Sequence, residues 1–330
     1  MNASTLTYRK RTTGRKTYAA GAAVVAALLT STACGPGAAD SSDEIKSSDR
    51  PNAASPAEPG GTASAEEAPA DEPVAMAAAA FTNRVATFNV DNPSSRLRKG
   101  RHLNRIVNEI ARYRPQVIAL QEICVKETNA IVERLRKKGY TYRVAHGSVT
   151  RHGGRCLGYG TSYGNAILSA APLTGKKNTR YTRPSTDRDD KAENRGHVSA
   201  YTTVAGKKVR VFATHLSEGG QRAERNAQIK ELLVAVKKHP NAIVLGDFNA
   251  TPTYSEMKPV WKEFRDADPK CNAARSGPPC KPTLGKDTSP NRKKFDYILL
   301  RKGGRFSASG VGVHPNYSNH DLVHADLRAR

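Results

Sequence analysis

The sequence predicts one α/β domain with much antiparallel pairing, and two observations support that prediction. Segments with strand-like and helix-like hydrophobic patterning alternate from residue 81 to residue 330. A hairpin signal, Ala205-Gly206, separates two strand-like segments. No internal repeat or shift in composition divides this stretch, so we expect a single domain over residues 81–330.

The first part of this domain is predicted to contain three strands and two helices. Strands are expected over residues 84–90 (RVATFNV), 117–123 (VIALQEI) and 164–169 (GNAILS), because each is a short apolar run. A helix follows the first strand, and a second is expected around residues 128–138. The apolar face of the first helix, at helical spacing, comprises Leu97, Leu103, Ile106, Val107 and Ile110.

The second part continues the alternation. Residues 198–204 and 208–214 form the predicted hairpin, and a helix is expected over residues 223–238, ended by His239-Pro240. The remaining predicted strands cover residues 242–247, 295–300 and 322–327.

Polar side chains occur where these apolar strands begin or end. A carboxylate within an apolar run is costly unless it is paired or bound to a metal. Several such residues in one domain therefore suggest that they converge on a single cleft. They are Asn89, Gln121, Glu122, His215, Asp247, Asn249, Asp296, Asn319 and His320.

In this order, the residues resemble the endonuclease/exonuclease/phosphatase superfamily, also called deoxyribonuclease-I-like. The resemblance runs from about residue 84 to residue 327 and depends on QE, THL, GDFN, DYIL and NHD occurring together, since each alone is weakly specific. It implies a four-layer α/β/β/α sandwich of two mainly antiparallel sheets, with the site at one edge of both sheets. It also implies metal-assisted in-line displacement at phosphorus.

The resemblance assigns a role to each residue. By this resemblance, Glu122 would be the principal metal ligand, and Asn89 and Asn319 would be further ligands. Mg²⁺ is the expected ion because it prefers oxygen ligands, and Mn²⁺ and Ca²⁺ are alternatives. His320 becomes the general base that deprotonates the attacking water, and Asp296 orients its ring.

Further roles follow from the same resemblance. Asp247 and Asn249 would position the water and a phosphoryl oxygen, and His215 would hydrogen-bond or protonate the phosphate. Asn165 would support that region, and Arg195 would contact phosphate.

One departure from the family pattern concerns the metal. The family has Ser-Asp-His before the last strand, whereas this chain has Ser318-Asn319-His320. Asparagine keeps an oxygen ligand but loses a negative charge, which would weaken metal affinity unless Asp321 compensates electrostatically.

Charge favours one substrate class among those of the superfamily. The chain has 53 basic and 30 acidic residues, and residues 81–330 alone carry a net charge of +25. A nucleic-acid enzyme gains from such a charge by releasing counterions, so we favour a nuclease acting on DNA, with RNA as the alternative. A sphingomyelinase-like lipid phosphodiesterase would need exposed aromatic loops, but the chain has a single Trp, Trp261, and seven Phe.

Three other functions remain open besides the nuclease. Two are enzymes: the lipid phosphodiesterase and a small-molecule phosphatase. The third is a polyanion-binding module at the cell surface without catalytic activity, which the loss of a metal-binding charge at Asn319 would favour. NTPase and zinc-protease activities lack support, because neither a P-loop nor an H-E-x-x-H motif occurs. We expect a monomer.

The amino-terminal residues predict export. Residues 1–34 have five basic residues and then a short apolar run, over residues 19–29, that is too short for a bilayer span of about 20 residues. The segment ending at Cys34 resembles a bacterial lipoprotein box, and ordinary cleavage near Ala38-Ala39 is the competing interpretation. Residues 35–80 carry nine acidic and two basic residues among Ala, Pro and Ser, and predict a disordered linker. The protein is therefore expected to be secreted or lipid-anchored on the outer face of the membrane.

Cysteine usage agrees with an exported domain. Setting Cys34 aside leaves four cysteines, which allow three disulfide pairings. The short separation of Cys271 and Cys280 favours a local bridge, and Cys124–Cys156 then follows. A zinc site is disfavoured because the spacing lacks C-x-x-C.

Overall fold

The computed structural model describes residues 81–91, 101–149, 156, 163–186, 192–275, 279–284, 292–315 and 318–330. The predicted export signal (residues 1–34), the predicted linker (residues 35–80) and Leu97 lie outside the described residues. These predictions, and the domain boundary at residue 81, therefore remain predictions.

One six-stranded sheet is built around a parallel pair. Strands β1 and β2 run parallel because helix α3 (Arg101–Tyr113) crosses from one to the other, and every other neighbouring pair is antiparallel. In spatial order the strands are β13 (Phe306–His314), β14 (Leu322–Ala329), β1 (Thr82–Asn89), β2 (Pro115–Cys124), β4 (Tyr163–Ser169) and β3 (Arg143–Ser148).

The second six-stranded sheet repeats this plan. Strands β9 and β10 are its parallel pair, connected by helix α5 (Arg222–Lys237), and its other neighbours are antiparallel. In spatial order the strands are β11 (Phe264–Asp266), β12 (Asp296–Arg301), β10 (Ala242–Asp247), β9 (Lys207–His215), β8 (Gly196–Val204) and β5 (Thr174–Arg180). The short strands β6 (Ser185–Thr186) and β7 (Ala192–Glu193) pair separately.

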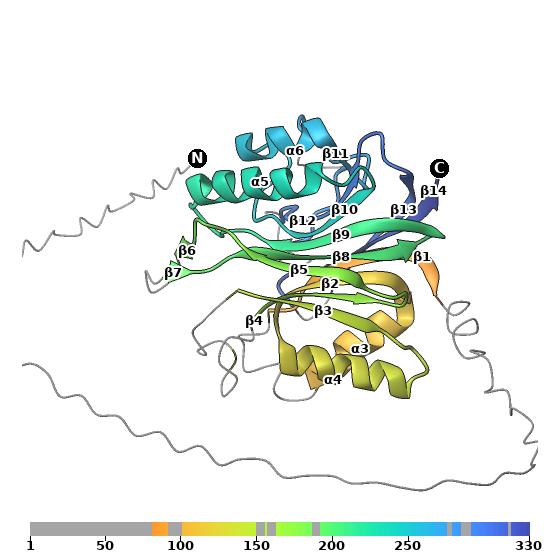
Figure 1. Cartoon of the computed structure of the whole chain (residues 1–330). Coiled ribbons are helices and arrows are strands. Elements are labelled where there is room, and N and C mark those ends of the chain that lie inside the picture. The colour runs from red at the N-terminus through yellow and green to blue at the C-terminus, as the bar shows by residue number, and fades with distance from the viewer. Residues whose placement is uncertain are drawn as a thin grey trace, which may run out of the picture. The chain divides into compact units, whose positions relative to one another are not determined.

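The two sheets pack face to face, and helices cover their outer faces (Figure 1). Alternation along β2 shows the arrangement: Val117 and Ala119 lie in the core between the sheets, whereas Ile118 and Leu120 pack beneath α3 and α4 (Val125–Lys137). On the second sheet, α5 and α6 (Lys258–Glu263), with the short helix η1 (Ser255–Met257) before α6, cover the other outer face. The predicted four-layer sandwich is therefore confirmed.

Strand register brings the polar strand ends together. Asn89 at the end of β1 pairs with Gln121 of β2, and Asp247 at the end of β10 pairs with both His215 of β9 and Asp296 of β12. Parallel strands end at the same edge of a sheet, so the last residues of each parallel pair lie next to each other at that edge. The strand ends of both sheets meet there.

Several elements escaped prediction from the sequence. Strands β3, β5, β11 and β13 and helix α6 were not predicted, whereas the predicted strands and helices within the described residues all occur. Strand β5 is an edge strand of sequence TGKKNTR, almost wholly exposed, so it lacks the apolar alternation on which prediction depends. Within the basic run 292–294, Lys294 is buried and ion-paired to Asp266 at 3.0 Å.

Both predicted disulfides are present, Cys124–Cys156 and Cys271–Cys280. Within the described part of the chain, the structure has no helix with the length and apolar character needed to cross a membrane.

Candidate active site

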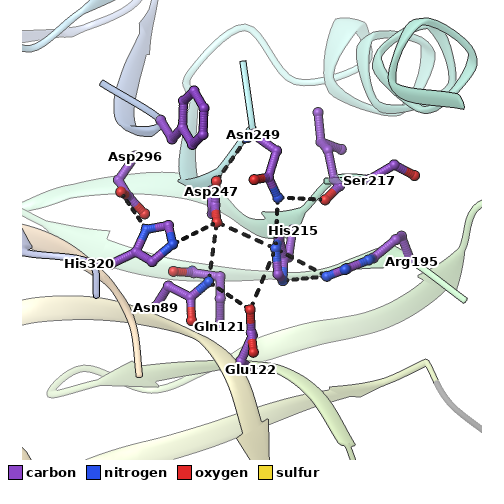
Figure 2. Close-up of polar contacts among 12 residues, drawn as sticks. Asn89, Gln121, Glu122, Arg195, His215, Ser217, Asp247, Asn249, Asp296 and His320 are labelled. Atoms are coloured by element: carbon purple, nitrogen blue, oxygen red, sulfur yellow. Dashed lines mark hydrogen bonds and ion pairs between the residues drawn. The ribbon is translucent and has the colours of Figure 1, made fainter. Parts of the chain in front are cut away.

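The side chains at the edge shared by the two sheets form one connected network of polar contacts (Figure 2). They come from strand ends, from the residues beside β8 and β10, and from the loop before β14. The network contains Asn89, Glu122, Arg195, His215, Asp247, Asn249, Asp296 and His320.

Glu122 reaches the network because β2 is bulged at this position. The pairing of β2 with β4 shifts register between Leu120 and Ile123, and Glu122 has a positive φ of 53°. Leu120 and Ile123 both pack on the helix side, so one extra residue is inserted between them. This insertion turns Glu122 toward Asn89 instead of toward the helices. A positive φ is unusual for a non-glycine residue, and such strain is concentrated at functional sites.

Asn89 connects the two sheets. Its side-chain nitrogen donates to Glu122 Oε1 and to Asp247 Oδ2, both at 3.1 Å, while its oxygen accepts from the backbone N–H of Asp91 at 3.1 Å. Asn89 therefore holds two carboxylates side by side. The predicted ligand role would use its oxygen, which here faces Asp91.

His320 and Asp296 form a buried dyad. His320 Nδ1 lies 2.9 Å from Asp296 Oδ2, and Nε2 lies 3.6 Å from Asp247 Oδ2. Burial by itself lowers the pKa of His320, but the charges of Asp296 and Asp247 and the hydrogen bond to Asp296 outweigh burial and raise this pKa to about 10. Asp296 thus fixes the ring and its tautomer, leaving Nε2 to face the network.

The GDFN segment places Asp247 and Asn249 through its backbone. Asn249 has a φ of 49°, and its N–H donates to Asp247 Oδ1 at 2.8 Å. A Cβ at Gly246 would lie 2.0 Å from the Thr214 carbonyl oxygen, so only glycine fits between β9 and β10. Burial, reinforced by the nearby Asp296, raises the pKa of Asp247 to about 7 against the opposing effect of His320.

His215 is held by a buried arginine. Arg195 Nη1 lies 2.7 Å from His215 Nδ1, and Asn249 Nδ2 lies 3.0 Å from His215 Nε2. The same Nε2 is 3.4 Å from Asp247 and 3.9 Å from Glu122. Arg195, which is only 3% exposed, is ion-paired to Glu193 at 3.4 Å. Sequence reasoning missed Glu193, because a two-residue strand in a loop carries no pattern.

A segment outside the predicted strands supports the dyad. Thr283 Oγ1 accepts from the N–H groups of Phe295 and Asp296, each at 3.0 Å, and the Thr283 carbonyl accepts from the N–H of Asp321 at 2.8 Å. The Cys271–Cys280 disulfide lies just before this segment. Nothing in the sequence marked Thr283, since its contacts are to residues distant along the chain.

The remaining predicted site residues lie around the network. Asn165 is buried in β4 and donates to the Gly196 carbonyl at 3.1 Å, next to Arg195. Asn319 is exposed, and its oxygen accepts from Ser318 Oγ at 3.4 Å. Asp321 is buried and ion-paired with Arg292, so its negative charge is neutralised locally.

The donors at this edge fit a hard divalent cation. Asp247, Asp296 and His320 offer ligand atoms that all lie within 4.8 Å of one another, and Glu122 adds a partly exposed carboxylate. Within the described residues, Asp296 Oδ1 is buried without a hydrogen-bond partner. Carboxylate oxygens are the preferred ligands of Mg²⁺, so the residues present suit such an ion, although its identity does not follow from them.

Comparison with known proteins agrees with this architecture. A model of the Endonuclease/Exonuclease/phosphatase family matches residues 86–320. A solved endonuclease/exonuclease/phosphatase from Beutenbergia cavernae DSM 12333 is similar with a TM-score of 0.59 at 21% identity, covering 74% of this chain and 71% of that chain. D. rerio TDP2, solved in complex with a single strand DNA product, has a TM-score of 0.56 at 19% identity, covering 74% and 98%.

A further similar structure is a functionally unknown conserved protein from Enterococcus faecalis V583, with a TM-score of 0.56 at 18% identity, covering 75% of this chain and 100% of that chain. No curated protein sequence matches the chain. At these identities the solved structures establish the fold.

Fold and site together define a hydrolase of the phosphodiesterase type. Because the family model matches most of the chain, the chain belongs to the endonuclease/exonuclease/phosphatase family. Members of this family are hydrolases that act on phosphodiester bonds.

Proposed function

We propose that this protein is an exported, divalent-metal-dependent nuclease that hydrolyses DNA, with RNA as the alternative substrate. The observation that supports it most directly is the Glu122–Asn89–Asp247 connection between the two sheets, next to the Asp296–His320 dyad. This arrangement places oxygen ligands suited to a metal ion beside a candidate general base, in a domain with a large positive net charge.

In the proposed mechanism, His320 Nε2 accepts the proton of the attacking water while Asp296 fixes the ring. This role requires a neutral His320, which a bound cation would favour by offsetting the charges of Asp296 and Asp247 that raise its pKa. Asp247, 3.6 Å from that nitrogen, holds the water in line with the phosphorus. His215 donates to the phosphate, oriented by Arg195. When bound, a divalent cation supplies positive charge that offsets the carboxylates and stabilises charge on the phosphoryl oxygens.

Surface character favours a nucleic acid over a lipid interface. Within the described residues, Val234 and Tyr254 are the large hydrophobic side chains that are exposed; Val234 lies in α5 and Tyr254 just before η1. Insertion into a membrane would require a larger apolar patch. The net charge of +25 on residues 81–330 instead suits a polyanion. D. rerio TDP2, whose structure contains a single strand DNA product, offers a parallel in a protein of the same fold.

Export is part of this proposal. It is supported by the basic and apolar residues 1–34 and by two disulfides, which persist in oxidising compartments. Lipidation at Cys34 would anchor the chain to the outer face of the membrane, and the acidic residues 35–80 would act as the spacer. We propose a monomer as the working form.

Cleavage assays test the activity directly. The full-length chain is incubated with plasmid DNA, RNA or sphingomyelin vesicles, with Mg²⁺ or with a chelator. We expect DNA loss that requires the metal and that falls at least about 100-fold in Glu122→Gln. Metal stabilisation of the transition state contributes several kcal/mol, and each 1.4 kcal/mol is a factor of ten.

The matched control is Glu133→Gln, which removes an exposed carboxylate on α4 and should keep full activity. DNA retardation without cleavage, also with Mn²⁺ or Ca²⁺, would instead support a polyanion-binding module. Choline phosphate release without DNA cleavage would make the lipid phosphodiesterase the better assignment.

Salt dependence tests the role of the charge. We expect KM for long DNA to rise steeply between about 50 and 200 mM salt, because binding that neutralises many phosphates weakens with the release of counterions. A dinucleotide substrate, with one phosphodiester, should show a much flatter profile. Equal salt dependence for both substrates would contradict a role of the basic surface in DNA binding.

A further inference from the structure

The outer face of the second sheet is only partly covered by helices. The apolar cluster beneath α5 and α6 draws on β9, β10, β11 and β12, and among the described residues it includes none from β8 or β5. On this face β8 carries His197, Ser199 and Tyr201, and β5 carries Lys177 and Thr179, paired in register with Ser199 and His197. These polar side chains leave an open channel beside α5.

A cavity of about 440 Å³ occupies this channel. We call it the α5–β8 pocket; the residues that define it are Lys177, His197, Arg210, Phe212, Lys230 and Lys238. Its volume is typical of small-molecule sites. It lies on the outer face of the sheet, and none of its lining residues takes part in the network of Figure 2.

Two side chains of the pocket, Arg210 and His197, are buried, and each has a nitrogen atom without a hydrogen-bond partner among the described residues. Arg210 is 7% exposed and His197 is 2% exposed. Within the described residues, Arg210 Nε and His197 Nδ1 have no hydrogen-bond partner, although Arg210 Nη2 donates to Ser199 at 2.8 Å. Buried polar groups are nearly always paired, so these two atoms mark incompletely paired side chains behind the pocket wall, closed off from solvent.

The charge of the pocket is strongly positive. Lys177, Arg210, Lys230 and Lys238 line it, and no ion pair involves them among the described residues. The one carboxylate in the lining, Glu231, accepts hydrogen bonds from the backbone and hydroxyl of Thr182. Burial and the nearby Lys177 and Arg210 lower the pKa of His197 to about 4, as expected where positive charge is uncompensated.

Part of the wall is apolar. Phe212 of β9 and Val234 and Ala235 of α5 line it, beside the polar residues Thr179, Ser199 and His239. Val234 is 63% exposed, so its side chain is available to a bound group. A bound group that covered it would remove apolar area from water.

We propose that the α5–β8 pocket binds a small organic phosphate, a phosphate monoester whose aromatic or aliphatic body rests on Phe212, Val234 and Ala235. A dianion matches the guanidinium of Arg210 and the surrounding lysines, which are the side chains that recognise phosphate. The volume of about 440 Å³ is of the size that small-molecule sites have. This inference does not depend on the proposed nuclease activity.

Calorimetric titration of the full-length chain with phenyl phosphate, in the presence of chelator, tests the proposal. Lys230→Glu/Lys238→Glu reverses two exposed charges of the pocket, and we expect binding at least 10-fold weaker than in the unaltered protein. Lys258→Glu/Lys262→Glu on α6 makes the same change of net charge on exposed residues outside the pocket and should bind normally. Glu122→Gln should also bind normally, which separates this pocket from the active site.

Three results would overturn the proposal. The first is equal binding by the two double variants, which would place the ligand elsewhere. The second is loss of binding in Glu122→Gln, which would assign it to the active site. The third is inorganic phosphate binding as tightly as phenyl phosphate, which would remove the role of the apolar wall. Because the substituted lysines are exposed, none of these outcomes depends on a folding defect.

Discussion

Replacing His320 with glutamine should lower kcat for DNA hydrolysis by about 10³-fold, within the range typical of a lost general base. Glutamine keeps a polar group between Asp296 and Asp247, where His320 lies 2.9 Å and 3.6 Å from their carboxylates, but it cannot accept and release the proton. The steady-state rate on plasmid DNA, measured on protein whose circular dichroism spectrum is unchanged, checks this expectation.

The control is His324→Gln. His324 is also buried, lies in β14 and contacts His314 at 3.2 Å, but it takes no part in the network of Figure 2. It should keep full activity. More than a tenth of the activity remaining in His320→Gln would show that another group accepts the proton.

The second large effect concerns stability. Lys294→Met should reduce the free energy of unfolding by about 3–5 kcal/mol, because it leaves the buried carboxylate of Asp266 without its partner. Lys294 is 1% exposed, and its Nζ lies 3.0 Å from Asp266 Oδ2 and 3.0 Å from the Asp296 carbonyl oxygen. Urea unfolding measures the change.

Two further variants make this interpretation specific. The neighbouring Lys293 is exposed, so Lys293→Met should change stability by less than about 0.5 kcal/mol. Adding Asp266→Asn to Lys294→Met should recover most of the loss, since no charge is then left unpaired. Burial raises the pKa of Asp266 while Lys294 opposes that rise. An unchanged stability in Lys294→Met would therefore mean that Asp266 is protonated in the folded protein.

The fold could largely be predicted because its central strands are buried on both faces. Segments such as 117–123 and 242–247 have continuous apolar runs, and prediction located β2 and β10 within a few residues. An edge strand pairs with one neighbour only and is largely exposed to solvent. The sequence of β5 therefore has no hydrophobic pattern by which it could be predicted. The four layers followed from the family resemblance, and the order of the strands in each sheet came only from the structure, since local patterning says nothing of long-range pairing.

Candidate site residues could be picked out from the sequence where polar residues interrupt apolar strands. Glu122 and Asp247 stand out in this way, and the structure brings both to Asn89. The supporting contacts could not be predicted: Glu193 lies in a two-residue strand, and Thr283 holds Asp296 from an irregular segment. Their positions depend on how loops pack against the finished sheets, which no local pattern records.

The first sheet is completed by the last strands of the chain. Strands β13 and β14 close the sheet that β1 began, and His320 stands directly before β14. During synthesis, the carboxylates of both sheets are complete long before the residue proposed to accept the proton exists. By the proposed mechanism, a chain in which β14 has not yet paired with β1 would hold the carboxylates of both sheets without its base in place, and would be inactive.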